Sequence, residues 1–150
     1  MTDRVEKQVE IAAPVARVWR ALTDYREFGE WFLVKLDGPI VAGEPILGQI
    51  THPGYEHVRF MALCVKVEPQ RLFSFSWNPY AIDQTKDYSH ETPTLVEFTL
   101  EPTAKGTLLK VVESGFDKVP ADRRDLAFRM NDGGWAQQMK HIEAYVAKNP

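Results

Sequence analysis

The chain begins with an alternation of residue types that is typical of a β-strand. Val5, Val9 and Ile11 share one side with Lys7, and glutamate or glutamine fills the positions between them. This period of two predicts a half-buried strand over residues 5–11.

Apolar residues change to helical spacing after this first strand. Pro14 suits the first turn of a helix, and residues 15–22 carry apolar side chains every three or four positions. Asp24 is a suitable cap for a second short helix over residues 25–28. The aromatic segment 29–32 is then expected to be a loop.

The middle of the chain has the pattern of an antiparallel sheet. Five apolar or alternating runs are separated by turn residues. They predict strands over residues 45–51, 57–67, 71–77, 95–100 and 108–114. The polar segment 78–93 is long for a hairpin connection, and such loops are commonly functional or mobile.

The end of the chain predicts one long amphipathic helix from Pro120 to Lys148. Its apolar stripe, spaced at i, i+7, i+11, i+14 and i+18, consists of Phe128, Trp135, Met139, Ile142 and Val146. Asn131 falls on the same stripe. Gly133 and Gly134 interrupt the helix, at a cost of roughly 2 kcal/mol relative to alanine. Either the helix ends at the glycines or another group approaches its backbone closely. Because the apolar stripe keeps its helical spacing across the glycines, the sequence favours a continuous helix that covers a ligand cavity.

Together these elements predict an α+β fold in a single domain over residues 1–150. A curved six-stranded antiparallel sheet would wrap around the long C-terminal helix, with two short helices between the first and second strands. This arrangement buries both amphipathic surfaces.

Composition and charge argue against nucleic acid as a binding partner and against a membrane span. The 150 residues are 44% hydrophobic, and 18 Lys+Arg against 21 Asp+Glu give a net charge of −3. Binding of nucleic acid through a basic surface is therefore not expected. The N-terminus is polar, unlike a signal peptide, and no apolar run approaches the roughly 18 residues of a membrane span. A single cysteine, Cys64, fits a reducing compartment, so the expected location is the cytoplasm.

Three segments resemble the START-like or helix-grip (SRPBCC) superfamily: residues 11–23 (IAAPVARVWRALT), 29–32 (GEWF) and 131–135 (NDGGW). Their order is most similar to the bacterial branch related to the C-terminal domain of the activator of heat-shock-protein-90 ATPase, and residues 110–116 (KVVESGF) are similar too. The resemblance implies a hydrophobic tunnel between the sheet and the long helix, used for lipids, polyketides, hormones or drugs. It also implies a chaperone as a partner.

Glu113 is the most interesting ionisable residue. It shares a face of the last predicted strand with Leu109 and Val111, and this face is expected to be the concave side of the sheet. A carboxylate there could orient a polar ligand group or act as a general base. Alternatively, it reaches water at the strand end or pairs with a strand residue such as Arg59.

Aromatic walls with a few convergent polar groups describe a small-molecule pocket. The candidate ligand-binding residues are Trp31, Trp77, Glu113, Phe128, Asn131 and Trp135. For the aromatic residues the alternative is a filled core, and for the Asn131 amide it is a hydrogen bond to a loop backbone.

Metal and cofactor chemistry has little support in the sequence. The histidines His52, His57, His90 and His141 lack the spacing of a zinc site, and no glycine-rich phosphate loop is present. No metal or cofactor is therefore expected, and Cys64 is interpreted as a small buried hydrophobe.

Three functions remain open from the sequence. The first is binding of a small hydrophobic or amphipathic molecule between the sheet and the C-terminal helix. The second is a cyclase or hydrolase type of enzyme with Glu113 as general base, for which one acid without a second partner is a thin catalytic set. The third is a protein-interaction module, a chaperone cofactor or a homodimer, which requires an exposed apolar patch.

Overall fold

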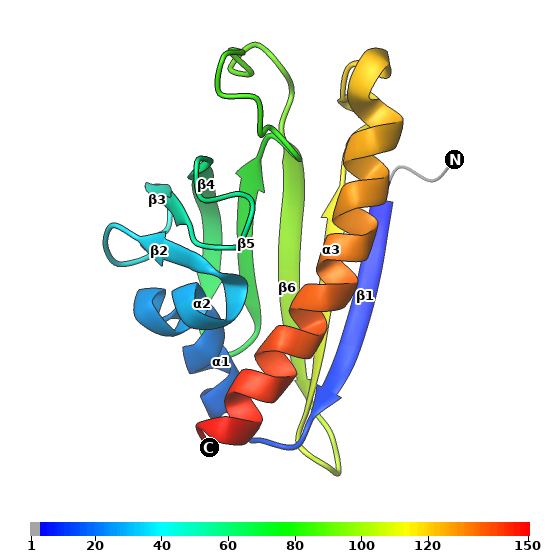
Figure 1. The fold of residues 1–150 in the computed structure, drawn as a ribbon. Helices are drawn as coiled ribbons and strands as arrows, with labels where there is room; N and C mark the ends of the chain where they lie inside the picture. Colours follow the sequence, from blue (N-terminus) through cyan, green and yellow to red (C-terminus); the bar gives the residue numbers. More distant parts are fainter. Residues whose placement is uncertain (1–3) are drawn as a thin grey trace.

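The computed structural model describes residues 4–150 and shows a curved antiparallel sheet with one long helix lying across it (Figure 1). The strands are β1 (Arg4–Ile11), β2 (Val34–Leu36), β3 (Pro45–Ile50), β4 (Arg59–Glu68), β5 (Leu72–Trp77), β6 (Thr94–Pro102) and β7 (Thr107–Ser114). The helices are α1 (Val15–Thr23), α2 (Tyr25–Phe32), the 3-10 helix η1 (Phe116–Lys118) and α3 (Ala121–Lys148). The strand order is β1-β7-β6-β5-β4-β3-β2. The predicted α+β helix-grip fold is confirmed.

The sheet within residues 4–150 has seven strands, one more than the six expected. The additional strand, β2, buries Val34 and Leu36 around an exposed Lys35 and pairs with β3 at the sheet edge. Three residues are too few for an alternation to stand out in a sequence. The pairing with β3, which is a long-range contact, is what makes them a strand.

The prediction of a loop over residues 29–32 is wrong, because α2 continues to Phe32. The Asp24 side chain caps this helix by accepting hydrogen bonds from two backbone N–H groups in the first turn. Gly29, which suggested a loop, is required by packing instead: a Cβ there would collide with the backbone carbonyl of Val34. The glycine therefore lets β2 pass close to the helix.

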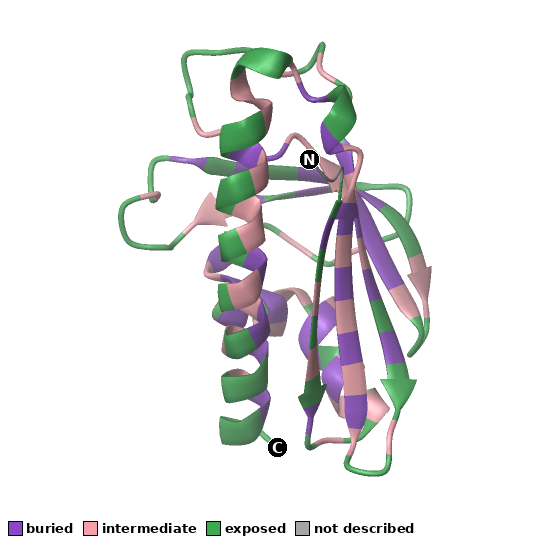
Figure 2. Cartoon of the chain, turned by 90° about the vertical axis from the view of Figure 1, so that its right-hand side faces the viewer, coloured by how far each residue is buried: buried purple, intermediate pink, exposed green. Residues whose placement is uncertain are grey.

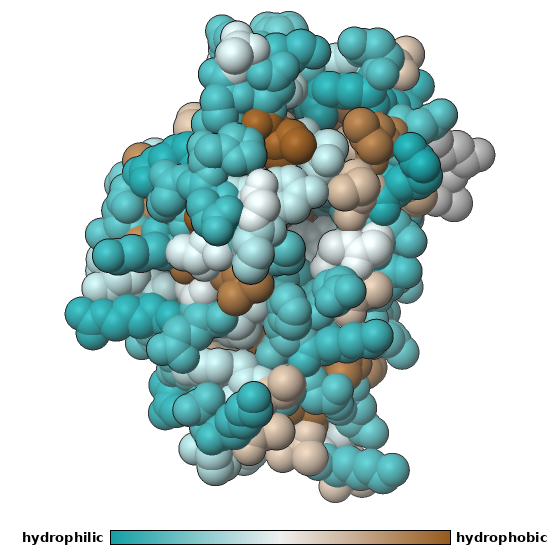
Figure 3. Space-filling view, viewed as in Figure 1, coloured by the Kyte–Doolittle hydropathy of each residue, from teal (hydrophilic) through white to brown (hydrophobic). Residues whose placement is uncertain are grey.

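The long helix α3 continues through Gly133 and Gly134, as the phase of its apolar stripe predicts. Its buried side chains are Ala127, Trp135, Met139, Ile142 and Val146. They face the concave side of the sheet. Buried and more exposed residues alternate along the strands, and the buried ones point to this side (Figure 2). The surface of the molecule in the view of Figure 1 is mostly hydrophilic, with isolated apolar side chains (Figure 3). The core therefore lies between the sheet and α3, with α1 and α2 covering one end.

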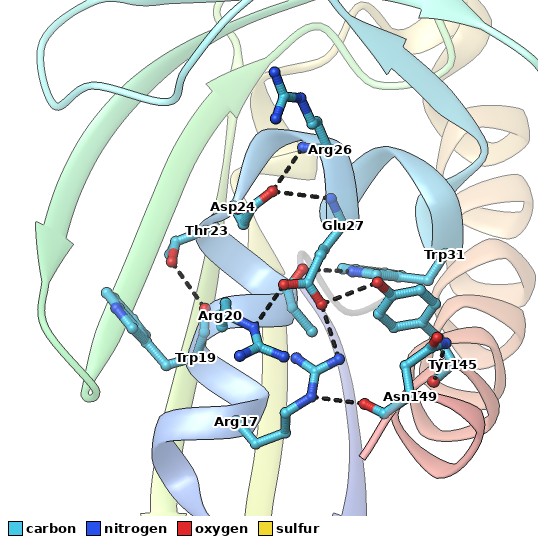
Figure 4. Close-up of polar contacts among 11 residues, drawn as sticks. Arg17, Trp19, Arg20, Thr23, Asp24, Arg26, Glu27, Trp31, Tyr145 and Asn149 are labelled. Carbon is cyan, nitrogen blue, oxygen red and sulfur yellow. Dashed lines mark hydrogen bonds and ion pairs between the residues drawn. The ribbon is translucent and has the colours of Figure 1, made fainter.

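The C-terminal end of α3 is held by polar contacts around Glu27 on α2 (Figure 4). The Glu27 carboxylate accepts hydrogen bonds from Arg20 at 2.8 Å and from the Tyr145 hydroxyl at 2.9 Å, and pairs with Arg17 at 2.8 Å. Arg17 also donates to the backbone carbonyl of Asn149 at 2.8 Å. The pKa of Tyr145 is raised to about 12, mainly by burial and secondly by the hydrogen bond to Glu27. These contacts join α1, α2 and α3.

The N-terminal end of α3 is held by Arg123. Its guanidinium forms an ion pair with Glu91 and donates to the backbone carbonyl of Pro79 at 2.6 Å. The Arg123 and Glu91 side chains are only 13% and 7% exposed. Because both partners lie in the segment 78–93, this ion pair fixes the long loop to the helix.

Residues 4–150 contain neither a disulfide nor a candidate metal site. Cys64 is buried and free, and burial raises the pKa of its thiol. This part of the chain contains no group of three His, Cys, Asp or Glu residues placed to hold a metal ion. None of its helices has the length and apolarity needed to cross a membrane.

Candidate ligand-binding site

The carboxylate of Glu113 lies at the centre of the site and is fully buried, with 0% of the residue exposed. It stands near the end of β7, on the same buried face as Leu109 and Val111. This is the orientation that the alternation of β7 predicts. Glu113 does not pair with Arg59, whose partner is Asp37.

Four side chains donate hydrogen bonds to the Glu113 carboxylate. Oε1 accepts from the Asn131 amide at 2.8 Å and from the Trp135 indole at 2.8 Å. Oε2 accepts from the Trp77 indole at 2.7 Å and from the Thr94 hydroxyl at 2.6 Å. Two donors on each oxygen match an ionised carboxylate, which only accepts hydrogen bonds. None of the four donors carries a charge.

Three neighbouring strands and α3 bring these groups together. Trp77 at the end of β5 is opposite Thr94 at the start of β6, and Glu113 on β7 is opposite Val96 two residues further along β6. Thr94 was not among the residues predicted from the sequence. Its position next to Glu113 depends on the register between β6 and β7, which no local pattern reveals.

A pocket of about 90 Å³ lies beside this cluster. It is lined by Phe32, Trp77, Asn131, Gly134, Trp135 and Gln138. The four residues from α3 are spaced at i, i+3, i+4 and i+7 and so lie on one helical face. Trp77, Asn131 and Trp135 both line the pocket and donate to Glu113. The pocket is therefore next to the buried carboxylate.

Three aromatic rings form the apolar wall of the pocket. The ring centroids are 6.3 Å apart for Phe32 and Trp77, 6.0 Å for Phe32 and Trp135, and 5.9 Å for the two tryptophans. Phe32 was not among the site residues predicted from the sequence, although its neighbour Trp31 was. Its presence depends on the extension of α2.

Amide groups form the polar part of the pocket wall. Asn131 uses its Nδ2 for Glu113, while its Oδ1 accepts no hydrogen bond within residues 4–150. Gln138 donates from Nε2 to the backbone carbonyl of Phe32 at 3.1 Å, and its Oε1 is 2.9 Å from Nδ1 of His141. Asn131 Oδ1 is thus the side-chain acceptor left available beside the pocket.

Two of the six predicted site residues lie away from this pocket. Trp31 is 2% exposed, packs among core aromatic residues and donates to the backbone carbonyl of Ala21 at 2.8 Å. Phe128 is half-buried and packs edge-on against Phe116, with ring centroids 5.2 Å apart. The other four, Trp77, Glu113, Asn131 and Trp135, converge at the pocket.

A second cavity, of about 320 Å³, lies between the loop 78–93 and the beginning of α3. Its lining is mainly polar and consists of Lys86, Asp87, Tyr88, His90, Glu91, Pro120 and Asp122. It shares no lining residue with the pocket beside Glu113. Most of its lining side chains are charged, with Tyr88 and Pro120 as the apolar part, so it fits an amphipathic ligand less well.

Comparison with known proteins gives a family and several related folds. The sequence model of the family described as "Activator of Hsp90 ATPase homolog 1-like protein" matches residues 12–147. No curated protein matches the chain. Protein MLL2253 from Mesorhizobium loti has a similar structure, with 29% identity, 98% of each chain covered and a TM-score of 0.76.

Two further solved structures share the fold at lower identity. DynU16, a putative protein in the dynemicin biosynthetic locus, is 23% identical with a TM-score of 0.76. That match covers 99% of this chain and 49% of DynU16, so the chain spans about half the length of that protein. CalU16 from Micromonospora echinospora is 20% identical with a TM-score of 0.62, covering 95% of this chain and 74% of CalU16.

Proposed function

Because the chain belongs to the family of proteins like activator of Hsp90 ATPase homolog 1, within the START-like helix-grip superfamily, we propose that it binds a small amphipathic molecule. The site would be the pocket between the sheet and α3. The observation that carries this proposal is the pocket of about 90 Å³ beside Glu113. It combines an apolar wall with a few oriented polar groups, which is the usual composition of a small-molecule site.

Glu113 has a positioning role in this proposal. Three of its four hydrogen bonds hold the indole rings of Trp77 and Trp135 and the amide of Asn131 in fixed orientations. The binding surface is therefore organised before the ligand arrives, which lowers the entropy cost of binding. Asn131 Oδ1 then accepts a hydrogen bond from the polar end of the ligand.

The size of the pocket limits how much of a ligand it holds. Drug-sized ligands occupy sites of roughly 300–1,000 Å³, and a cavity of about 150 Å³ holds benzene. The pocket, at about 90 Å³, is smaller than either. We therefore infer that one compact end of the ligand enters, while the remainder lies along the surface beside the exposed Gly134.

Tryptophan fluorescence tests the proposal because Trp77 and Trp135 line the pocket. Titration with decan-1-ol, below its solubility limit, should give a saturable change in emission. The variant Gly134→Leu places a side chain on the pocket-lining face of α3 and should abolish that change.

Gly133→Leu is the matched control. It introduces the same residue one position away, at a glycine that does not line the pocket. The control should retain wild-type binding. An equal loss of binding in both variants, or no saturable response in the wild type, would contradict the proposal.

The enzymatic alternative, with Glu113 as general base, has less support. A general base needs a free lone pair within reach of the proton that it removes. Each oxygen of Glu113 already accepts two hydrogen bonds. The geometry thus favours positioning over proton transfer.

A second candidate function, association with a heat-shock-protein-90 chaperone, is favoured by an apolar stripe on the outer face of the sheet. Exposed apolar side chains on β3 and β4 form this stripe: Leu47, Met61, Leu63 and Val65, which are 41–64% exposed. Leu47 and Met61 are directly paired. The family description names an ATPase activator, so the test is stimulation of chaperone ATPase activity. Stimulation should disappear in Met61→Lys, and no stimulation by the wild type would refute this function.

A further inference from the structure

We propose that the pocket beside Glu113 selects ligands whose polar end is an organic cation, a methylated or protonated ammonium group. This inference rests on the proposed function, because it assumes that the pocket receives one end of a small molecule. It assigns the chemical class of that end from the charge and the aromatic geometry of the pocket wall.

The first argument is the uncompensated charge of Glu113. Four neutral donors saturate its carboxylate, and no lysine, arginine or histidine pairs with it within residues 4–150. Dipoles stabilise the charge locally but do not cancel it. In a buried, low-dielectric environment the field of an unpaired charge extends over several ångströms. The pocket, whose walls contact the carboxylate directly, therefore lies in a negative potential.

The second argument is the orientation of the two indole rings. Trp77 and Trp135 direct their ring N–H edges at the carboxylate, at 2.7 and 2.8 Å. An indole N–H bond lies in the plane of its ring, so the two π-faces of each ring point at right angles to this hydrogen bond. The face of an aromatic ring is its negative side, and donation to an anion polarises the indole further in this sense. The faces of both rings therefore attract a cation more strongly.

The third argument is the arrangement of rings and acceptors around the space. Phe32, Trp77 and Trp135 have centroids 5.9–6.3 Å apart. A cation in the pocket can therefore lie within about 6 Å of more than one ring, the range of cation–π attraction. Asn131 Oδ1 adds the negative end of a neutral dipole, which accepts a hydrogen bond only where the ammonium group carries an N–H. An anionic end group would instead meet these negative surfaces without a cationic partner.

The test uses two ligands of nearly the same shape that differ in charge. Choline and 3,3-dimethylbutan-1-ol both carry a two-carbon alcohol, attached to a trimethylammonium or a tert-butyl group. We expect choline to bind the wild-type protein at least tenfold more tightly, measured by tryptophan fluorescence at constant ionic strength with sodium chloride as the control salt. Equal or tighter binding of the neutral alcohol would overturn the cation preference and leave the proposed function intact.

Variants separate the charge of Glu113 from other effects. Glu113→Gln preserves the size of the side chain and should reduce the choline preference to less than threefold. Asp132→Asn is the matched control, since it removes a half-exposed carboxylate one residue from the pocket wall and should leave the preference unchanged.

Trp135→Phe is a second variant in case Glu113→Gln does not fold. It keeps an aromatic ring, loses the N–H donor to Glu113, and should weaken choline binding more than binding of the neutral alcohol. Retention of the full preference in a folded variant of either kind would refute the inference. If choline and its neutral analogue both fail to bind while decan-1-ol binds, the cation preference alone is refuted. Failure of all three ligands refutes the proposed function as well.

Discussion

Alanine at position 133 or 134 tests why α3 contains two adjacent glycines. Both lie in the interior of a 28-residue helix, and neither adopts a positive φ. Apart from the adjoining backbone of α3, a Cβ atom added at either position would meet no atom within 4 Å. Alanine therefore introduces neither backbone strain nor a collision, and only the intrinsic helix preference changes.

The expected stabilisation follows from that preference. Glycine is less favourable than alanine in a helix interior by about 0.8–1.0 kcal/mol, so each substitution should raise the free energy of unfolding by about 1 kcal/mol. For a protein of this size, 1 kcal/mol corresponds to an increase in melting temperature of about 2–4 °C. Urea denaturation followed by far-ultraviolet circular dichroism measures the change, with an unchanged m-value.

The two variants should differ in ligand binding. Gly134 lines the pocket of about 90 Å³ and Gly133 does not. A methyl group is similar in size to a water molecule, so alanine at 134 would occupy a substantial part of this small space. Gly134→Ala should be more stable but bind decan-1-ol several-fold more weakly, whereas Gly133→Ala should be more stable and bind normally.

Two results would refute this reasoning. Destabilisation by either alanine would mean that the glycines satisfy a packing requirement that the structure does not contain. Identical affinities in both variants would mean that the ligand does not use the face of α3 that carries Gly134.

Three further predictions concern the polar clusters. Arg123→Ala leaves the largely buried Glu91 side chain without its cation, so it should cost up to about 3 kcal/mol and speed limited proteolysis within residues 78–93; wild-type cleavage rates would contradict this. Glu113→Gln leaves buried donors without an acceptor and should lower stability to urea by about 2–3 kcal/mol, whereas unchanged stability would mean the four hydrogen bonds matter little. The folded pKa of Tyr145, about 12, exceeds the unfolded value of about 10. Its contribution to stability should therefore be complete below pH 10 and lost between pH 10 and 12. The difference in absorbance at 295 nm between wild type and Tyr145→Phe should titrate near pH 12 rather than 10.

Local periodicity was sufficient for much of this protein. The two-residue alternation of β7 places Glu113 on the buried face, and the helical stripe of α3 places Trp135 inward across two glycines. Polar turn residues also mark the loop 78–93 correctly, between β5 and β6. These features depend on neighbours within a few positions along the chain, which is the range in which side-chain period determines burial.

Other features depended on contacts between distant segments. β2 exists through its pairing with β3, and position 29 of α2 requires glycine because the carbonyl of Val34 passes beside it. Both required knowledge of where another part of the chain runs.

The composition of the site was decided in the same way. Strand register brings Thr94 to Glu113, and the extension of α2 brings Phe32 to the pocket. Phe128, on the same apolar stripe as Trp135, packs against Phe116 instead. The sequence determined which residues turn inward, because that follows from local geometry. Only the tertiary structure decided which inward residues meet, because register and packing join segments that are far apart in the chain.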